Sequence, residues 1–170
     1  AILSLNLAAA DVTAEVSKAI DANTKASAKV KAFAKKTLLP HSKNAVFVKA
    51  VKAQNAKGVS LDAIKKIDNE WKDAEDELPI QAKLTSNACA KEIKKIAGAN
   101  AAIVEAFVMD NQGAVVGENN LTSDYWQGDE AKWTNSYNGG KGGVDVGKVK
   151  LDKSANVQLQ QISLPIIDES

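Results

Sequence analysis

The sequence contains no arginine, one cysteine, one histidine and no long apolar run. All 22 basic residues are Lys, so the planar, two-pronged contacts that Arg makes with phosphate, carboxylate and guanine are absent. We therefore expect no nucleic-acid binding. One cysteine cannot form an internal disulfide or build a metal cage alone. No stretch approaches the roughly 20 apolar residues that a membrane span needs.

The two rare side chains are weak candidates for chemistry. Cys89 lies at an apolar position of a helical pattern, which favours a buried structural thiol over a nucleophile. His41 follows Pro40 between two helical segments and is expected to be a loop residue. No His, Cys and Asp residues have zinc-site spacing, and no nucleophile motif is present. We predict no metal, no cofactor and no enzymatic activity.

The charges that are present are unevenly distributed. Residues 1–100 hold 17 Lys against 11 acidic residues, and residues 101–170 hold 5 Lys against 10, so the halves carry about +6 and −5. The Lys residues follow helical patterns instead of forming one block, which is typical of a solvated helix surface. The first residues, AILSLNLAAAD, resemble an apolar signal core with a small-x-small cleavage pattern, although the first turns of an amphipathic helix would look the same.

The first hundred residues have helical periodicity. A mostly apolar stripe with steps of four and three predicts one long Ala-rich helix over about residues 4–38, ending before Pro40. Its positions are Val12, Val16, Ala19, Asn23, Ala26, Val30, Phe33 and Thr37. Further helices are expected over about 44–56, from a Ser60 cap to near Pro79, and over about 80–97. We expect an N-terminal helix, residues 1–40, and one domain over 41–170.

A β-rich part follows Gly98. The stretch EAFVMDNQGAVVGE holds two apolar runs around Asp110-Asn111-Gln112-Gly113, which predicts a β-hairpin. VGKVKLD and NVQLQQISLPI alternate apolar and polar residues and predict further strands. The order of helices over 44–97 and an antiparallel sheet over 101–168 indicates an α+β fold.

Two superficial sites are rejected. The stretch Gly142 to Lys148 matches G-x-x-x-x-G-K, but Val149 stands where a magnesium-binding Ser or Thr belongs, and a strand pattern follows where a helix is needed. Asp110 could be a catalytic or metal-binding carboxylate, but a role in opening the hairpin turn by bonding its own backbone is favoured.

The segment TSDYWQGDEAKW, Thr122 to Trp133, is the strongest candidate site. Four of the eight aromatic residues of the chain lie in or just after it: Tyr125, Trp126, Trp133 and Tyr137. A helix from about Gly128 would place Asp129, Trp133 and Tyr137 four apart on one face. Aromatic walls with a few fixed polar groups commonly line small-molecule pockets, although the same residues could only pin the loop to the sheet.

The run FVMDNQGAVVGENNLTSDYWQGDEAKW resembles bacterial extracytoplasmic sensor domains of the Cache or PDC type, in particular a small branch with a TSDYWQGDEA motif. The resemblance extends to VKAQNAKGVSLDAIKKIDNEW and QLQQISLPIID. It implies a long N-terminal helix packed on a PAS-like antiparallel sheet and a periplasmic or otherwise extracytoplasmic location. Ligand binding would be relayed through that helix. The implied pocket residues are Tyr125, Trp126, Asp129 and Trp133, with Asp124 and Lys132 less certain.

The residues of this segment favour an amine or a neutral polar metabolite as the ligand. No Arg is present to fork onto a carboxylate, whereas acidic side chains pair an ammonium and aromatic rings attract it by roughly 0.5 to 2 kcal/mol. A bound cation ranks third. The expected macromolecular partners are a membrane-bound signalling protein and a second copy that pairs through the N-terminal helix.

Two other functions compete with the sensor hypothesis. In one, the chain is a structural or interaction module without a ligand, and the aromatic segment only stabilises the fold. In the other, it is a hydrolase that uses paired carboxylates among Asp124, Asp129 and Glu130. Adjacent helical residues such as Asp129 and Glu130 point in different directions, which disfavours the hydrolase.

Overall fold

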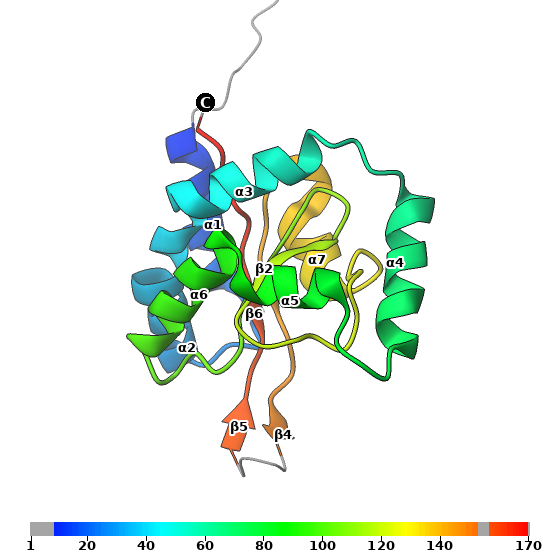
Figure 1. Cartoon of the computed structure of the whole chain (residues 1–170). Coiled ribbons are helices and arrows are strands. Elements are labelled where there is room, and N and C mark those ends of the chain that lie inside the picture. Colours follow the sequence, from blue (N-terminus) through cyan, green and yellow to red (C-terminus); the bar gives the residue numbers. More distant parts are fainter. Residues whose placement is uncertain (1–8, 153–156, 170) are drawn as a thin grey trace, which may run out of the picture. The chain divides into compact units, whose positions relative to one another are not determined.

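The computed structural model describes residues 9–152 and 157–169 (Figure 1). It confirms the α+β class and divides into two compact units: unit 1, Ala1–Asn44 with Ala131–Ser170, and unit 2, Ala45–Glu130. The predicted division at residue 40 differs from this one, because the last 40 residues group with the N-terminal segment. Among the described residues, no helix has the length and apolar character to cross a membrane. Most of the signal-like N-terminal stretch lies outside the described residues.

Unit 1 combines helices with pairs of short strands. β3 pairs with β6 and β4 with β5, both antiparallel. The buried side chains Val16, Ile20, Ala34 and Leu39 form its core, against which Val12, Val144, Ile162 and Leu164 pack. The two separate stretches of chain therefore share one apolar core. The elements are α1 Ala9–Ala22, α2 Ala28–Phe33, η1 Ala34–Leu38, η2 Leu39–Lys43, α7 Ala131–Tyr137, η3 Asn138–Gly140, β3 Asp145–Val146, β4 Lys150–Asp152, β5 Val157–Leu159 and β6 Ile162–Ser163.

The prediction of one long N-terminal helix is wrong. α1 ends at Ala22, and the Asn23 side chain accepts hydrogen bonds from the backbone N–H groups of Lys25 and Ala26, at 2.9 and 3.1 Å. Ser27 then caps α2 by accepting from Val30 N. Asn and Ser bond locally to the backbone and so compete with helix continuation. On α1 the buried side chains are Val16, which lies on the predicted stripe, and Ile20, which does not, whereas the predicted Ala19 is only partly buried.

Unit 2 holds the helices α3 Ala45–Asn55, α4 Leu61–Asp73, α5 Pro79–Ser86 and α6 Ala88–Gly98, and the strands β1 Phe107–Met109 and β2 Val115–Glu118. The Ser60 cap is confirmed, because its hydroxyl accepts from Ala63 N. The helix predicted over 80–97 is broken in two, because Asn87 caps α6 by accepting from Ala90 N. The Asn87 amide also donates to Val116 O at 2.9 Å and so ties this break to β2.

The predicted hairpin is confirmed. β1 and β2 are antiparallel, and Asp110 opens the turn by accepting from Gln112 N and Ala114 N at 2.8 and 3.0 Å. Ala114 also forms an antiparallel bridge with Trp126. Within the described residues the strands pair two by two, instead of forming the one larger sheet that we predicted. The strands of unit 1 are short and follow a Gly-rich stretch, where Gly weakens strand formation.

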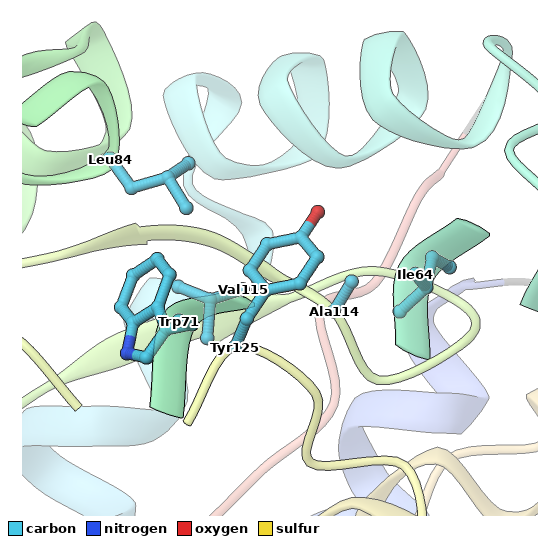
Figure 2. Close-up of a cluster of buried hydrophobic side chains, with 6 residues drawn as sticks. All are labelled: Ile64, Trp71, Leu84, Ala114, Val115 and Tyr125. Atoms are coloured by element: carbon cyan, nitrogen blue, oxygen red, sulfur yellow. The ribbon is translucent and has the colours of Figure 1, made fainter. Parts of the chain in front are cut away.

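The core of unit 2 lies between α4, α5 and the hairpin. Figure 2 shows its buried side chains: Ile64, Trp71, Leu84, Ala114, Val115 and Tyr125. α5 and α6 both pack on β2 (Figure 1). Cys89 is buried in α6, and burial raises the pKa of its thiol to about 12, in keeping with a structural thiol.

The close packing of α6 on β2 depends on Gly117. A Cβ added there would lie 2.7 Å from Cys89 Cβ and 3.0 Å from Ala90 N. We expect Gly117→Ala to lower the free energy of unfolding by about 1–3 kcal/mol, because the helix must shift. Urea unfolding measures this.

Gly98→Ala is the matched control. A Cβ at Gly98, the last residue of α6, meets nothing within 4 Å, so this variant should be neutral or more stable by about 0.5–1 kcal/mol. Equal urea midpoints for Gly117→Ala and the parent would contradict the close packing of α6 on β2 at Gly117.

Candidate functional site

Asp68 holds the aromatic segment to α4. The residue is 4% exposed, and Oδ1 accepts hydrogen bonds from Tyr125 N at 2.9 Å and Trp126 N at 2.8 Å. Oδ2 accepts from Lys72 Nζ at 2.6 Å, one helical turn further along α4. The carboxylate therefore satisfies two backbone donors and one ammonium at once, which compensates for its burial.

A second pair of contacts fixes the same segment from the next turn of α4. Trp71 Nε1 donates to Thr122 O at 3.0 Å, and the Trp71 ring stacks on Tyr125 with centroids 5.8 Å apart. Tyr125 is 3% exposed and belongs to the core (Figure 2). Burial, and secondarily the charge of Asp110, raise the pKa of the Tyr125 hydroxyl to about 12, so it stays protonated. Tyr125 thus serves the fold.

Trp126 differs from its neighbour because it is only half-buried. Its ring is fixed at one edge, where Nε1 donates to Gln112 O at 2.8 Å. Gly128 allows this close approach, since a Cβ there would lie 2.4 Å from both Gln112 O and Trp126 Nε1. The ammonium of Lys65 lies over the ring, 4.8 Å from its centroid. Trp126 is a rigid aromatic surface that already carries a cation.

The carboxylates of the segment act on a second cation. A hydrogen bond to Asp68 raises the pKa of the Lys72 ammonium above its usual value, burial lowers it by less, and the charges of Asp124 and Asp129 add to the rise. Asp129 is exposed and Asp124 is half-buried. Three carboxylates therefore create a local negative potential around Lys72.

A buried carboxyl lies at the start of the segment. Glu118 is 0% exposed, and its Oε2 accepts from Thr122 N at 3.0 Å and from Thr122 Oγ1 at 2.9 Å. Within the described residues Oε1 has no partner. Burial raises the pKa of the Glu118 carboxyl above its usual value, and the two hydrogen bonds from Thr122 lower it by less.

Gln127 leaves a second acceptor unsatisfied. Its side chain is 0% exposed, and Nε2 donates to Asp124 O at 2.9 Å and to Asp124 Oδ1 at 2.6 Å. These two donor bonds fix the orientation of the amide, because a flipped amide would face two acceptors with its oxygen. Among the described residues Oε1 has no partner. Unpaired buried oxygens next to Asp124 add to the acceptor excess of this region.

The predicted site residues divide between the two units. Asp124, Tyr125, Trp126 and Asp129 lie in unit 2, whereas Lys132 and Trp133 lie in α7 of unit 1. Asp129 precedes the helix, which begins at Ala131, so it does not share the predicted helical face. Trp133 and Tyr137 do stack four residues apart, with centroids 4.9 Å apart. The site that can be described is therefore the part in unit 2.

The sequence analysis missed the α4 side of this site. Lys65, Asp68 and Lys72 recur at steps of three and four on one face, a pattern also typical of an ordinary solvated helix. Asp68 is 57 residues from Tyr125, and nothing local in the sequence links them. No sequence pattern marked Glu118 and Gln127 as site residues, apart from their positions in the predicted hairpin and the loop that follows it.

Neither a protein-family model, nor a curated protein, nor a solved structure matches the chain. In the part of the chain that the structure describes, no group of three or more His, Cys, Asp and Glu residues could hold a metal ion.

The role of Asp68 can be tested by truncation. Asp68→Ala leaves the backbone N–H groups of Tyr125 and Trp126 without their acceptor, so we expect the unfolding free energy to fall by about 2–4 kcal/mol. Glu70→Ala, which removes an exposed carboxylate from the same helix, should change it by less than about 0.5 kcal/mol. Equal losses of unfolding free energy in the two variants would mean that Asp68 contributes only its negative charge and not its hydrogen bonds to Tyr125 and Trp126.

Glu118 should make stability depend on pH. Its folded-state pKa lies above the ordinary value of 4.5 for a Glu carboxyl, so its contribution to stability is fully present below pH 4.5 and is lost as pH rises through the folded pKa. Gln is neutral at every pH and keeps an oxygen for Thr122. We therefore expect the stability of Glu118→Gln relative to the parent to increase from pH 4 towards neutral pH, measured by urea unfolding at each pH. If the difference in unfolding free energy between Glu118→Gln and the parent does not change with pH, the folded protein accommodates the ionised Glu118 carboxylate without a cost.

Proposed function

We propose that the chain is a non-enzymatic, extracytoplasmic sensor domain of the Cache or PDC type that binds a small amine beside Trp126. The resemblance of the TSDYWQGDEA stretch supports the family, and an output to a membrane-bound signalling partner is part of the proposal. One observation carries the choice of ligand. Two ammonium groups of the chain itself occupy this surface, Lys65 over Trp126 and Lys72 on Asp68.

The chemistry of this surface supports a cation. Its fixed groups are the carboxylates of Asp68, Asp124 and Asp129 and the face of Trp126, all of which attract positive charge. An anionic ligand would find no strong, free donor among these groups. A neutral ligand with N–H or O–H donors ranks second.

A specific observation favours a second candidate, a structural or interaction module. Tyr125 is buried, and both Asp68 and Trp71 hold the segment by its backbone. These contacts would exist in a protein without any ligand. The two candidates differ in their prediction for the ring face of Trp126 that Lys65 covers, because only the binding role needs a ligand there.

A thermal-shift screen separates the candidates. We expect amines to raise the melting temperature, and carboxylates and sugars to leave it unchanged, because only amines complement the surface. A ligand at a hundred times its dissociation constant stabilises by about 2.7 kcal/mol, which corresponds to about 5–10 °C for a chain of this size.

Two variants locate the binding. Trp126→Leu should abolish the amine shift, and Asp129→Asn should weaken it with little change in the melting temperature of the free protein, because Asp129 is exposed. Glu70→Gln, on the solvent side of α4, is the control and should keep the full shift. No shift with any class of compound, or a shift that Trp126→Leu retains, would reject the proposal and favour the structural module.

A further inference from the structure

The two lysines that occupy the cation positions lie at a defined spacing. Lys65 and Lys72 are seven residues apart on α4, which is two turns of helix, so they project from nearly the same face. At a rise of 1.5 Å per residue their Cα atoms are separated by about 10 Å along the helix axis. Their ammonium groups reach separate acceptors, the Trp126 ring at 4.8 Å from its centroid and Asp68 Oδ2 at 2.6 Å.

These acceptors are rigidly connected to each other. Trp126 N donates to Asp68 Oδ1, so the aromatic and the carboxylate position belong to one hydrogen-bonded unit. The ring is fixed at its other end by Gln112 O. A ligand that reaches both positions would therefore meet groups whose separation does not change. Such preorganisation favours a ligand of matching length.

Both lysines can leave their positions. The side chain of Lys72 is 48% exposed, whereas that of Asp68 is 5% exposed, so the cation is the accessible member of the pair. Lys65 is exposed as well. The contact of the exposed Lys65 with Trp126 is weak, about 0.5–1 kcal/mol, whereas Lys72 pairs a buried carboxylate. Lys72 can therefore be replaced only by a cation that takes its place on Asp68 Oδ2.

Resting on the proposed function, we propose that the ligand is a linear polyamine, whose ammonium groups replace Lys65 over Trp126 and Lys72 on Asp68. The charges of Asp124 and Asp129, which act on Lys72, would act equally on a ligand ammonium in its place. Lys65 and Lys72 thereby act as internal competitors that set the affinity.

The test compares butylamine, putrescine, cadaverine, hexamethylenediamine and spermidine by calorimetry with the full chain. We expect affinity to rise with the separation of the terminal nitrogens, and spermidine to bind on the order of tenfold more tightly than butylamine, because the second ammonium binds intramolecularly. Lys65→Met removes one competitor and should strengthen spermidine binding. Lys66→Met removes an equal charge from the same helix and should not.

Lys72→Met gives a second readout. It leaves Asp68 Oδ2 without its ammonium, so the variant should melt below the parent, and spermidine should restore more stability to it than to the parent. Butylamine binding as tight as spermidine binding, without this rescue, would overturn the polyamine proposal and leave the amine site beside Trp126 standing. No binding of any amine would overturn both.

Discussion

The carboxylate of Asp68 is the constraint on which the rest of unit 2 depends. It accepts the backbone N–H groups of two consecutive residues, Tyr125 and Trp126, and thereby fixes the orientation of both side chains. Consecutive side chains of an extended segment point to opposite sides. Once the backbone is held, Tyr125 enters the core and the half-buried Trp126 packs against its edge, with its ring bonded to Gln112 O. A single buried acceptor thus separates an aromatic residue of the core, Tyr125, from one that is only half-buried, Trp126.

The electrostatic character of this region follows from an excess of acceptors over donors. Asp68, Asp124 and Asp129 act on Lys72, while Glu118 and Gln127 each bury an oxygen that lacks a partner among the described residues. Burying unpaired acceptors costs free energy unless a proton, a water molecule or a cation satisfies them. Glu118 relieves part of the cost by favouring its neutral form. The proposal of a cationic ligand refers only to the part of this excess that lies at the surface, the charges of Asp124 and Asp129.

The sequence predicted those features that depend on neighbouring residues. The turn Asp110 to Gly113 between two apolar runs indicated the hairpin, and Ser60 indicated the start of α4, because turns and caps are local. The breaks at Asn23 and Asn87 were missed, because the surrounding Ala and Lys residues favour helix and only the bonds of the Asn side chains decide otherwise. Asp68 could not have been placed, since its partners lie 57 and 58 residues away. Of the candidate site, the aromatic segment was identified, but the lysines opposite it looked like ordinary solvated residues.

The structural and the ligand-binding interpretations of this segment use different atoms of the same residues. The fold is held through backbone N–H and C=O groups, those of Tyr125, Trp126 and Thr122. Recognition would use the ring face of Trp126 and the carboxylates of Asp124 and Asp129, which these backbone contacts leave accessible. Because the backbone contacts immobilise the ring before any ligand arrives, binding would not have to order it, and less affinity would be lost to conformational entropy. Strong structural anchoring of this segment therefore does not count against a binding role. Both interpretations require the anchors, and only the ring face of Trp126 beneath Lys65 and the carboxylates distinguish them.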